Sequence, residues 1–258
     1  DEEGTFHALN AQTGARQWTF KTQGGISSSA NAAGQRLVFG SYDQHLYCLE
    51  ADDGALVWKL ATDGYIHSTP ALYGDFVLVT GCDAQLRLVH IKDGSEKYRL
   101  SLGAYIGASA AVVGQRAFVG TFANEVLGID LEQADILWRY QNPQRQFPFY
   151  ASPAATQDIV IVGGRDKMVH ALNPQTGEVL WMHAAGGRVD SSPVIAGDRV
   201  YYGGPHGLVA LELELGKEVW RFDTGAAISA SPAIAAGKLL IGAMDGIFYC
   251  FGQEVNHE

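Results

Sequence analysis

The chain has 258 residues, of which 47% are hydrophobic and 18% charged, so it is long enough to bury a large core. Its 28 Asp and Glu residues against 18 Lys and Arg give a formal net charge of −10, and no local cluster of basic residues stands out in the sequence. An acidic surface repels phosphate backbones, so the composition argues against a nucleic-acid partner. No apolar run approaches the roughly 20 residues that cross a bilayer, so no transmembrane segment is predicted.

The three cysteines, Cys48, Cys82 and Cys250, are scattered and form no CxxC or vicinal pair. We therefore expect them to be small buried hydrophobic side chains, and we predict neither a disulfide framework nor a zinc site. No signal peptide is visible, but the chain starts inside a repeated pattern. An upstream segment can therefore be missing, and the chain can be a fragment of a longer protein.

One hairpin pattern recurs along the chain, and its period decides the fold. It consists of a short strand, a tight turn and a second strand that ends on tryptophan, with copies at 8–18, 48–58, 171–181 and 211–220. The aromatic residues of successive repeats are 40, 40, 40, 43 and 39 residues apart, and they are Trp18, Trp58, Tyr98, Trp138, Trp181 and Trp220.

Three further segments return in the same order between successive aromatic residues. The first is rich in small residues and ends in Ser or Thr followed by Pro or Ala, and it predicts strands over 26–30, 66–70, 106–110, 149–153, 189–193 and 228–232. The second is apolar and predicts strands buried on both faces over 36–40, 76–81, 116–120, 159–163, 199–203 and 238–242. The third predicts strands over 5–9, 46–49, 86–89, 126–129, 169–172, 208–211 and 247–251. The repeated aromatic residue lies on a fourth strand that completes each repeat.

Four short antiparallel strands per repeat of about 40 residues are typical of a propeller blade. The pattern A-L-N-x-x-T-G-x-x-x-W, preceded by S-S-P and V-x-x-G, resembles the quinoprotein-type repeat, also called the PQQ-like or tryptophan-docking β-propeller repeat. The resemblance covers essentially the whole chain. It implies an all-β fold, a β-propeller of four-stranded antiparallel blades in one domain of residues 1–258. Each tryptophan is expected to fill the wedge between two blades.

The number of blades has two solutions. The third strand occurs seven times if residues 5–9 are counted, whereas the other strands occur six times each. We expect seven repeats with an incomplete first blade, because the opening residues resemble a complete hairpin. The alternative is a six-bladed ring, closed by residues 17–21 as the outer strand of the last blade.

The repeats provide an internal control for function. A position that keeps one residue type in every repeat serves folding, and the Ser or Thr before each Pro or Ala is such a position. Positions that vary are candidates for binding. In propellers the start of the first strand lies at one mouth of the central channel, so we predict a ligand-binding ring of Tyr65, His67, Tyr105, Tyr150, Arg188 and Asp190, with Phe149 beside it. Such a ring can bind a small anion, a peptide or a cofactor, and the alternative is a set of solvated residues around a wet channel.

A second candidate is the longest interruption of the repeat, residues 140–150. It contains two prolines, and its Arg145, Phe147 and Phe149 are residue types that anchor interfaces. Loops on a rigid scaffold often carry specificity, so we predict that these three residues bind a partner. The alternative is a surface loop whose aromatic rings pack back onto the blades.

Catalytic and metal motifs are missing from the sequence. The histidines lack a ligand spacing such as HxH or HExxH, and the turn residues Asp43, Asp83, Asp166 and Asp245 are explained by bonds to their own backbone. No metal site is therefore predicted, and no G-x-S-x-G, phosphate loop or Rossmann motif is present.

These observations favour a non-catalytic propeller that binds a ligand or a protein, as a scaffold or as a sensor module. The alternative is a PQQ-dependent dehydrogenase-like protein, but the resemblance to those enzymes fails at their vicinal Cys-Cys pair and their calcium ligands, so no cofactor is predicted. The identity of a protein or peptide partner is not encoded in a motif. The resemblance also implies a periplasmic or extracellular location, with the cytoplasm as the alternative because the cysteines are unpaired in the sequence pattern.

Overall fold

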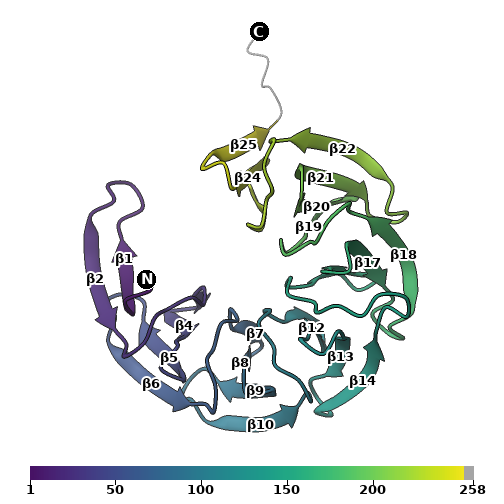
Figure 1. Ribbon diagram of the computed structural model, residues 1–258. Helices are drawn as coiled ribbons and strands as arrows, with labels where there is room; N and C mark the ends of the chain where they lie inside the picture. The colour runs from purple at the N-terminus through teal and green to yellow at the C-terminus, as the bar shows by residue number, and fades with distance from the viewer. Residues whose placement is uncertain (253–258) are drawn as a thin grey trace. The chain divides into compact units, whose positions relative to one another are not determined.

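The computed structural model describes residues 1–252, which form strands and turns without a helix. The strands make seven antiparallel sheets, of which five have four strands, one has two and one has three. This confirms the predicted all-β fold, in which four-stranded antiparallel sheets are the blades of a propeller (Figure 1). Within residues 1–252 there is no helical segment with the length and hydrophobicity to cross a membrane.

The chain divides into two compact units. The first unit is Asp1–Phe122 with Ile129–Ile136, and the second is Ala123–Gly128 with Leu137–Glu258. One sheet, with strand order β11-β12-β13-β14, contains residues of both units: β11 (Ala111–Val113), β12 (Arg116–Gly120), β13 (Val126–Asp130) and β14 (Asp135–Tyr140).

The first unit also contains a hairpin and two complete blades. The hairpin pairs β1 (Thr5–Leu9) with β2 (Arg16–Lys21). In both blades the strands pair in chain order. The first blade consists of β3 (Asn31–Ala33), β4 (Arg36–Gly40), β5 (His45–Glu50) and β6 (Leu56–Ala61). The second consists of β7 (Ala71–Tyr73), β8 (Phe76–Thr80), β9 (Gln85–His90) and β10 (Glu96–Ser101).

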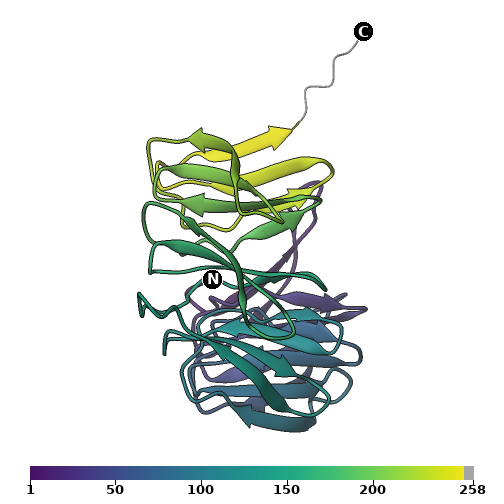
Figure 2. The same cartoon turned by 90° about the vertical axis from the view of Figure 1, so that its right-hand side faces the viewer.

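The second unit contains two complete blades and a three-stranded sheet, which Figure 2 shows lying one above another. The complete blades are β15 (Ala154–Ala155), β16 (Val160–Gly163), β17 (Met168–Leu172), β18 (Val179–Ala184), and β19 (Val194–Ala196), β20 (Arg199–Gly204), β21 (Gly207–Glu212), β22 (Glu218–Asp223). The three-stranded sheet is β23 (Ala233–Ala235), β24 (Lys238–Gly242) and β25 (Phe248–Gly252).

The sheets follow the seven-repeat prediction. β2 pairs with β1 over Thr5↔Lys21 to Leu9↔Arg16, so the two strands form a sheet of their own. The six-bladed alternative required residues 17–21 in the last sheet, where the structure has only β23, β24 and β25 among the residues described.

The second and third strands of each repeat form the core. β8 is buried from Val77 to Thr80 and β16 along its whole length, as expected of strands covered on both faces. In the second unit these strands pack between blades, where Ile161, Val169, Val200 and Val209 belong to one buried cluster.

The predicted position of the first strand of each repeat was wrong, because the observed strand starts just after the predicted segment and does not overlap it. The segments 26–30, 66–70 and their equivalents are irregular, and the strands begin directly after them. Serine hydroxyls in these segments accept bonds that a backbone carbonyl would otherwise accept, as where the Gly203 N–H donates to Ser191 Oγ at 2.9 Å. A proline at the end of four of the segments lacks a donor, so the regular ladder starts beyond it.

The repeated aromatic residue docks onto the hairpin turn of the next repeat. Trp58 donates its indole N–H to the carbonyl of Ile91 at 2.8 Å, and Trp181 donates to Leu213 at 2.9 Å. The same bond joins Trp18 to Ala51, Trp138 to Pro174 and, through its hydroxyl, Tyr98 to Leu131. Each of these five rings thus fills the space between neighbouring repeats, as predicted, and it also satisfies a turn carbonyl, which the sequence did not reveal. The prediction was wrong for the sixth, Trp220, whose side chain is 37% exposed.

The turn glycine is the platform for the docked ring. Gly94 has a φ of +73°, and a Cβ built on it would lie 2.7 Å from the ring of Trp58. Gly14 has nearly the same backbone angle, +69°, but nothing lies within 4 Å of such a Cβ. Where the docked residue is the smaller Tyr98, the platform is Ala134 instead of glycine.

We expect Gly94→Ala to destabilise the fold far more than Gly14→Ala. Both variants place alanine in a left-handed conformation, which costs about 1 kcal/mol. Only at Gly94 does the methyl group collide with an indole, which adds about 1–3 kcal/mol of overpacking. Urea unfolding followed by circular dichroism measures the difference, and equal losses for the two variants would contradict the platform role.

Candidate functional site

The predicted site residues lie on the connections between one repeat and the next. The first apolar residue is buried in five of the six connections, as Ile66 and Val189 show, and Ile26 in the other is half-buried. The Ser or Thr further along joins neighbouring repeats, since the Thr69 N–H donates to Ser109 Oγ at 2.8 Å and the Ser152 N–H to Ser192 Oγ at 2.9 Å. This confirms that the constant position serves folding, and binding at the variable position between them stays a prediction.

The variable residues of the first unit form an aromatic group. The Tyr42 hydroxyl lies 2.8 Å from His67 Nδ1, and the Tyr42 ring stacks on Tyr65 with centroids 5.3 Å apart. Partial burial lowers the pKa of His67 from its usual value, because it disfavours the imidazolium form. Tyr65 is half exposed, so this group offers ring faces to solvent.

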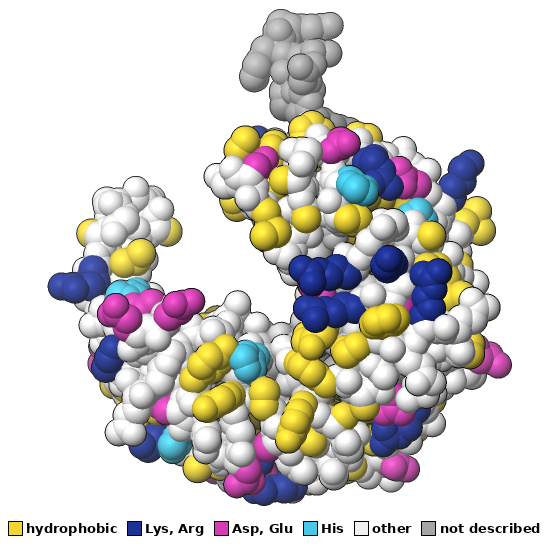
Figure 3. All heavy atoms as spheres, in the orientation of Figure 1, with side chains coloured by type: hydrophobic (Ala, Val, Ile, Leu, Met, Phe, Trp, Pro, Cys, Tyr) yellow, Lys and Arg dark blue, Asp and Glu magenta, His cyan; other side chains and the backbone are white. Residues whose placement is uncertain are grey.

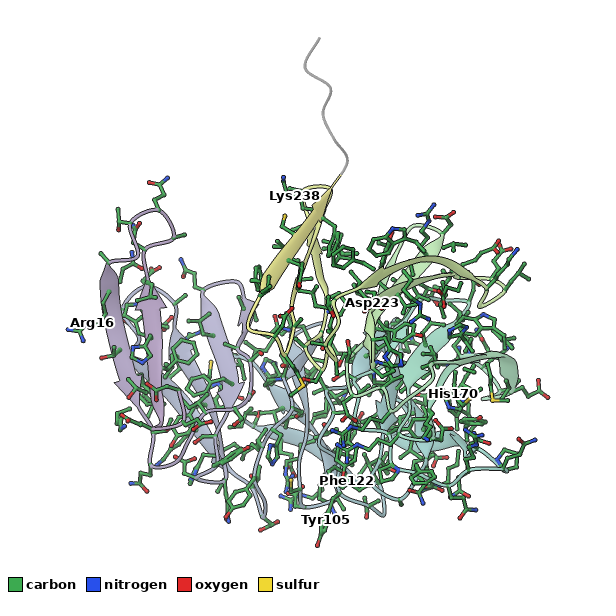
Figure 4. All side chains as sticks on the ribbon, turned by 45° about the horizontal axis from the view of Figure 1, so that its top comes forward. Arg16, Tyr105, Phe122, His170, Asp223 and Lys238 are labelled. Carbon is green, nitrogen blue, oxygen red and sulfur yellow. The ribbon has the colours of Figure 1, made fainter. Side chains whose placement is uncertain are left out.

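Tyr105 occupies the same position one repeat later. Its side chain is 62% exposed, and its carbonyl accepts the N–H of Phe122 at 3.0 Å. Figure 4 shows Tyr105 and Phe122 close together at the edge of the molecule. Phe122 is also exposed, so the aromatic surface extends along the first unit.

The variable residues of the second unit form a charged group. Arg165 donates to both oxygens of Asp190, at 2.7 and 3.1 Å, and its guanidinium lies 3.6 Å from the centre of the Tyr150 ring. Arg188 Nε approaches the same carboxylate at 3.5 Å, and its side chain is 73% exposed. The hydrogen bonds from Arg165 to Asp190 raise the pKa of Arg165, so this guanidinium is firmly cationic.

One rule positions both groups. In each group, the residue two positions after the second strand of one repeat contacts the variable residue of the next repeat, 25 positions later. Tyr42 contacts His67 in this way, and Arg165 contacts Asp190. Tyr42 and Arg165 were missed by the sequence analysis. The signal was present, because this position also varies between repeats, through Tyr42, Cys82, Phe122, Arg165, Pro205 and Met244.

The six predicted ring residues divide between the units. Tyr65, His67 and Tyr105 belong to the first unit, and Tyr150, Arg188 and Asp190 to the second. In the second unit Tyr150, Arg188 and Asp190 lie together around Arg165 and Asp190. In the first unit Tyr65 and His67 meet through Tyr42, whereas Tyr105 lies one repeat further on, beside Phe122.

The long loop places its three predicted residues differently. Phe147 is half exposed, and Arg145 is exposed while its Nη1 donates to the Asp166 carbonyl at 3.1 Å. Phe149 is only 1% exposed, so its predicted contact with a partner is corrected. Phe149 occupies the position that Ile66 and Val189 hold in other repeats, and it is therefore a core residue.

A buried polar network holds this loop. Asp166 Oδ2 accepts the side-chain N–H of Asn142 at 2.6 Å and lies 2.9 Å from Nε2 of His170. The other ring nitrogen of His170, Nδ1, lies 3.0 Å from the Tyr140 hydroxyl. The Phe149 ring packs edge-on against His170. Figure 4 shows His170 within the ribbon of this blade.

The charge of Asp166 is stabilised inside the blade. Burial alone would raise the pKa of Asp166, but the His170 ring, the Asn142 amide and the backbone N–H of Met168 outweigh it and hold the pKa below its usual value. The N–H bond to Asp166 Oδ1 is the backbone bond predicted for the turn aspartates, and Asp43, Asp83 and Asp245 make it as well. The bond to the second oxygen was not predicted.

A groove of about 330 Å³ opens beside the loop in the second unit. It is lined by Asn142, Gln144, Arg145, Lys167, Met168, Met182, Ala184 and Gly186. Its walls therefore come from the long loop, from the turn between β16 and β17 and from the end of β18. Figure 3 shows Lys and Arg side chains gathered over the region of β17 on the face in view.

Among residues 1–252, no three His, Cys, Asp or Glu side chains lie close enough together to form a candidate metal site. The cysteines do not meet either: Cys48 is buried, Cys82 is half-buried and Cys250 is exposed. The candidate surfaces consist of aromatic rings in the first unit and of cations beside apolar side chains in the second. These are means of recognition through contact, charge and ring stacking.

Comparisons with known proteins agree with the fold. Residues 2–147 and 185–254 match the family model described as outer membrane protein assembly factor BamB. Among solved structures, BamB from Moraxella catarrhalis is similar with a TM-score of 0.78 at 14% identity, over 97% of this chain and 80% of that one. The computationally designed Ika8 protein is similar with a TM-score of 0.85 at 16% identity, over 98% of this chain and 79% of that one. A search of curated sequences found no match.

Proposed function

Because the chain belongs to the family of outer membrane protein assembly factor BamB, we propose that it is a non-catalytic propeller that binds a protein partner as a scaffold or sensor module. The name of the family describes an assembly factor, a role that depends on contacts with other proteins. No cofactor takes part in the proposed function.

One observation carries the proposal: an exposed loop with interface-forming residues is fixed by a buried network. Phe147 and Arg145 are exposed on the loop, while Asn142 of the same loop is buried against Asp166. Such an arrangement presents contact residues in one conformation, which reduces the entropy lost on binding. We assign the partner contact to Arg145 and Phe147, continued by Arg188 and Tyr150 in the same unit.

Tyr65, His67 and Tyr105 are proposed as a further contact surface, for a ligand or for another part of the partner. Their exposed rings supply area at low entropic cost. The name of the family also supports a periplasmic or extracellular location, because an outer-membrane assembly factor works outside the cytoplasm.

The loop is tested by capture of partners from cell-envelope extracts. We expect the double variant Arg145→Ala, Phe147→Ala to retain about tenfold less of the specific partner than the unaltered protein, since buried aromatic and Arg anchors each contribute more than about 1 kcal/mol. Quantitative mass spectrometry of the captured proteins is the measurement.

The matched control is Leu215→Ala, which removes an exposed apolar side chain from the turn between β21 and β22. It should leave capture unchanged. If the loop variant captures the same partners in the same amounts, the loop is not the binding surface.

A further inference from the structure

We infer that the partner presents an acidic segment carrying an apolar side chain, and that this segment occupies the groove beside the long loop. The inference rests on the proposed function, because it names the chemistry of the partner that this surface takes. Its basis is an excess of exposed cations together with exposed methionine side chains in one small region of an acidic protein.

The cations at the groove outnumber the carboxylates beside them, because Arg145, Arg165, Lys167 and Arg188 lie in the same region as only Asp166 and Asp190. Asp166 is buried and is committed to Asn142, His170 and Met168. Asp190 is bound by both oxygens to Arg165, and its Oδ2 also lies 3.5 Å from Arg188 Nε, so one carboxylate faces two guanidinium groups. Arg145, Lys167 and Arg188 therefore carry exposed positive charge, on a chain whose formal net charge is −10.

Two of these cations line the groove, and the third, Arg188, lies on the segment that continues from it. Arg145 and Lys167 line the groove itself, and the Ala185 N–H, which donates to the Lys167 carbonyl at 3.0 Å, holds the segment leading to Arg188 against the same turn. Arg188 follows two residues after Gly186, which is also part of the lining. A field of one sign at the rim of a concave surface attracts a ligand of opposite charge.

Besides its two cations and the amides of Asn142 and Gln144, the lining contains apolar side chains. Met168 and Met182 lie on neighbouring strands of one blade, and Met182 is 45% exposed. Methionine side chains adapt to partners of different shape, which suits an apolar side chain of a peptide. Phe147, on the same loop as the lining residues Asn142, Gln144 and Arg145, is half exposed.

A peptide fits these features better than a phosphate-bearing ligand. The methionine lining offers nothing to a phosphate or sugar, whereas a peptide can place an apolar side chain on Met168 and Met182 and carboxylates on Arg145, Lys167 and Arg188. The overall negative charge of the chain further disfavours a long polyanion such as a nucleic acid.

The test uses a random peptide display library selected on the whole chain. We expect the enriched sequences to combine Asp or Glu with Leu, Ile, Met or Phe. The strongest peptide is then synthesised with a fluorescent label, and its affinity is measured by fluorescence polarisation. Enrichment of neutral or basic sequences, or no enrichment, overturns the inference.

Variants locate the peptide. Lys167→Glu and Met182→Ser should each weaken the acidic peptide about tenfold, equivalent to about 1.4 kcal/mol. Lys217→Glu makes the same charge change at an exposed position outside the groove and should have an effect of less than about twofold. Equal effects of Lys167→Glu and Lys217→Glu would show only long-range attraction and would overturn the groove.

The result also separates the two proposals. If a selected peptide loses binding with Phe147→Ala but not with Lys167→Glu, the loop binds a partner and only the acidic chemistry is wrong. If it is insensitive to both, the loop surface proposed for partner binding fails as well.

Discussion

Replacement of Trp58 by alanine is expected to lower the free energy of unfolding by about 3–5 kcal/mol. The ring is 9% exposed and packs in a cluster with Val38, Val77 and Val89 of neighbouring blades. The change leaves a cavity between repeats and removes the 2.8 Å bond to the Ile91 carbonyl. Urea unfolding monitored by far-ultraviolet circular dichroism measures the loss.

Two milder variants separate packing from hydrogen bonding. Trp58→Phe keeps an aromatic ring in the wedge but loses the N–H donor, so about 1–2 kcal/mol is expected. Tyr98→Phe removes the 2.7 Å bond to the Leu131 carbonyl with little change of volume and should cost about 1 kcal/mol. A Trp58→Ala loss no larger than that of Tyr98→Phe would mean that the indole does not fill the space between blades.

Asp166→Ala is the second change with a large expected effect, about 3–5 kcal/mol. It strips the buried partners Asn142 and His170 of their shared carboxylate. The matched control is Asp245→Ala, since Asp245 makes the corresponding bonds to the Ile247 N–H and the Tyr249 hydroxyl on an exposed turn. We expect a loss there of less than about 1 kcal/mol, measured by the same unfolding experiment.

The free energy of unfolding is expected to fall at acidic pH because of Asp166. The pKa of Asp166 is lower in the folded chain than its usual value of 3.8, so the unfolded chain binds the proton more readily. The stabilisation is therefore present above about pH 4 and is lost as the pH falls through the folded pKa. Between about pH 5 and pH 3 the unaltered protein should lose more stability than Asp166→Asn, and parallel losses would contradict the assignment.

The repeat pattern predicted the second and third strands well because their signal is local and strong. Residues 36–40 and 116–120 are strands with the bounds expected from their apolar runs. The first strand was misplaced because small residues and prolines fit both a strand and an irregular segment. The choice depends on hydrogen bonds between distant residues, such as Gly203 with Ser191, which no run of residues reveals.

The candidate site was predictable only in part. Alignment of the repeats found Tyr150 and Asp190, which the structure joins through Arg165. The same alignment places Phe149 in a buried position, but its occurrence in a long loop obscured this. Groups formed in space, such as the cations Arg145, Lys167 and Arg188, cannot appear as a cluster in a sequence where other segments separate them.

The docking bond tolerates changes in chain length, and this has a consequence for how the protein can diversify. Trp138 reaches Pro174 across 36 positions, whereas Trp18, Trp58 and Tyr98 reach their acceptors across 33. The additional residues extend the loop at 141–149 and leave the tie between repeats intact. New segments can therefore be grafted at these connections during evolution, or in the laboratory, without redesign of the seams.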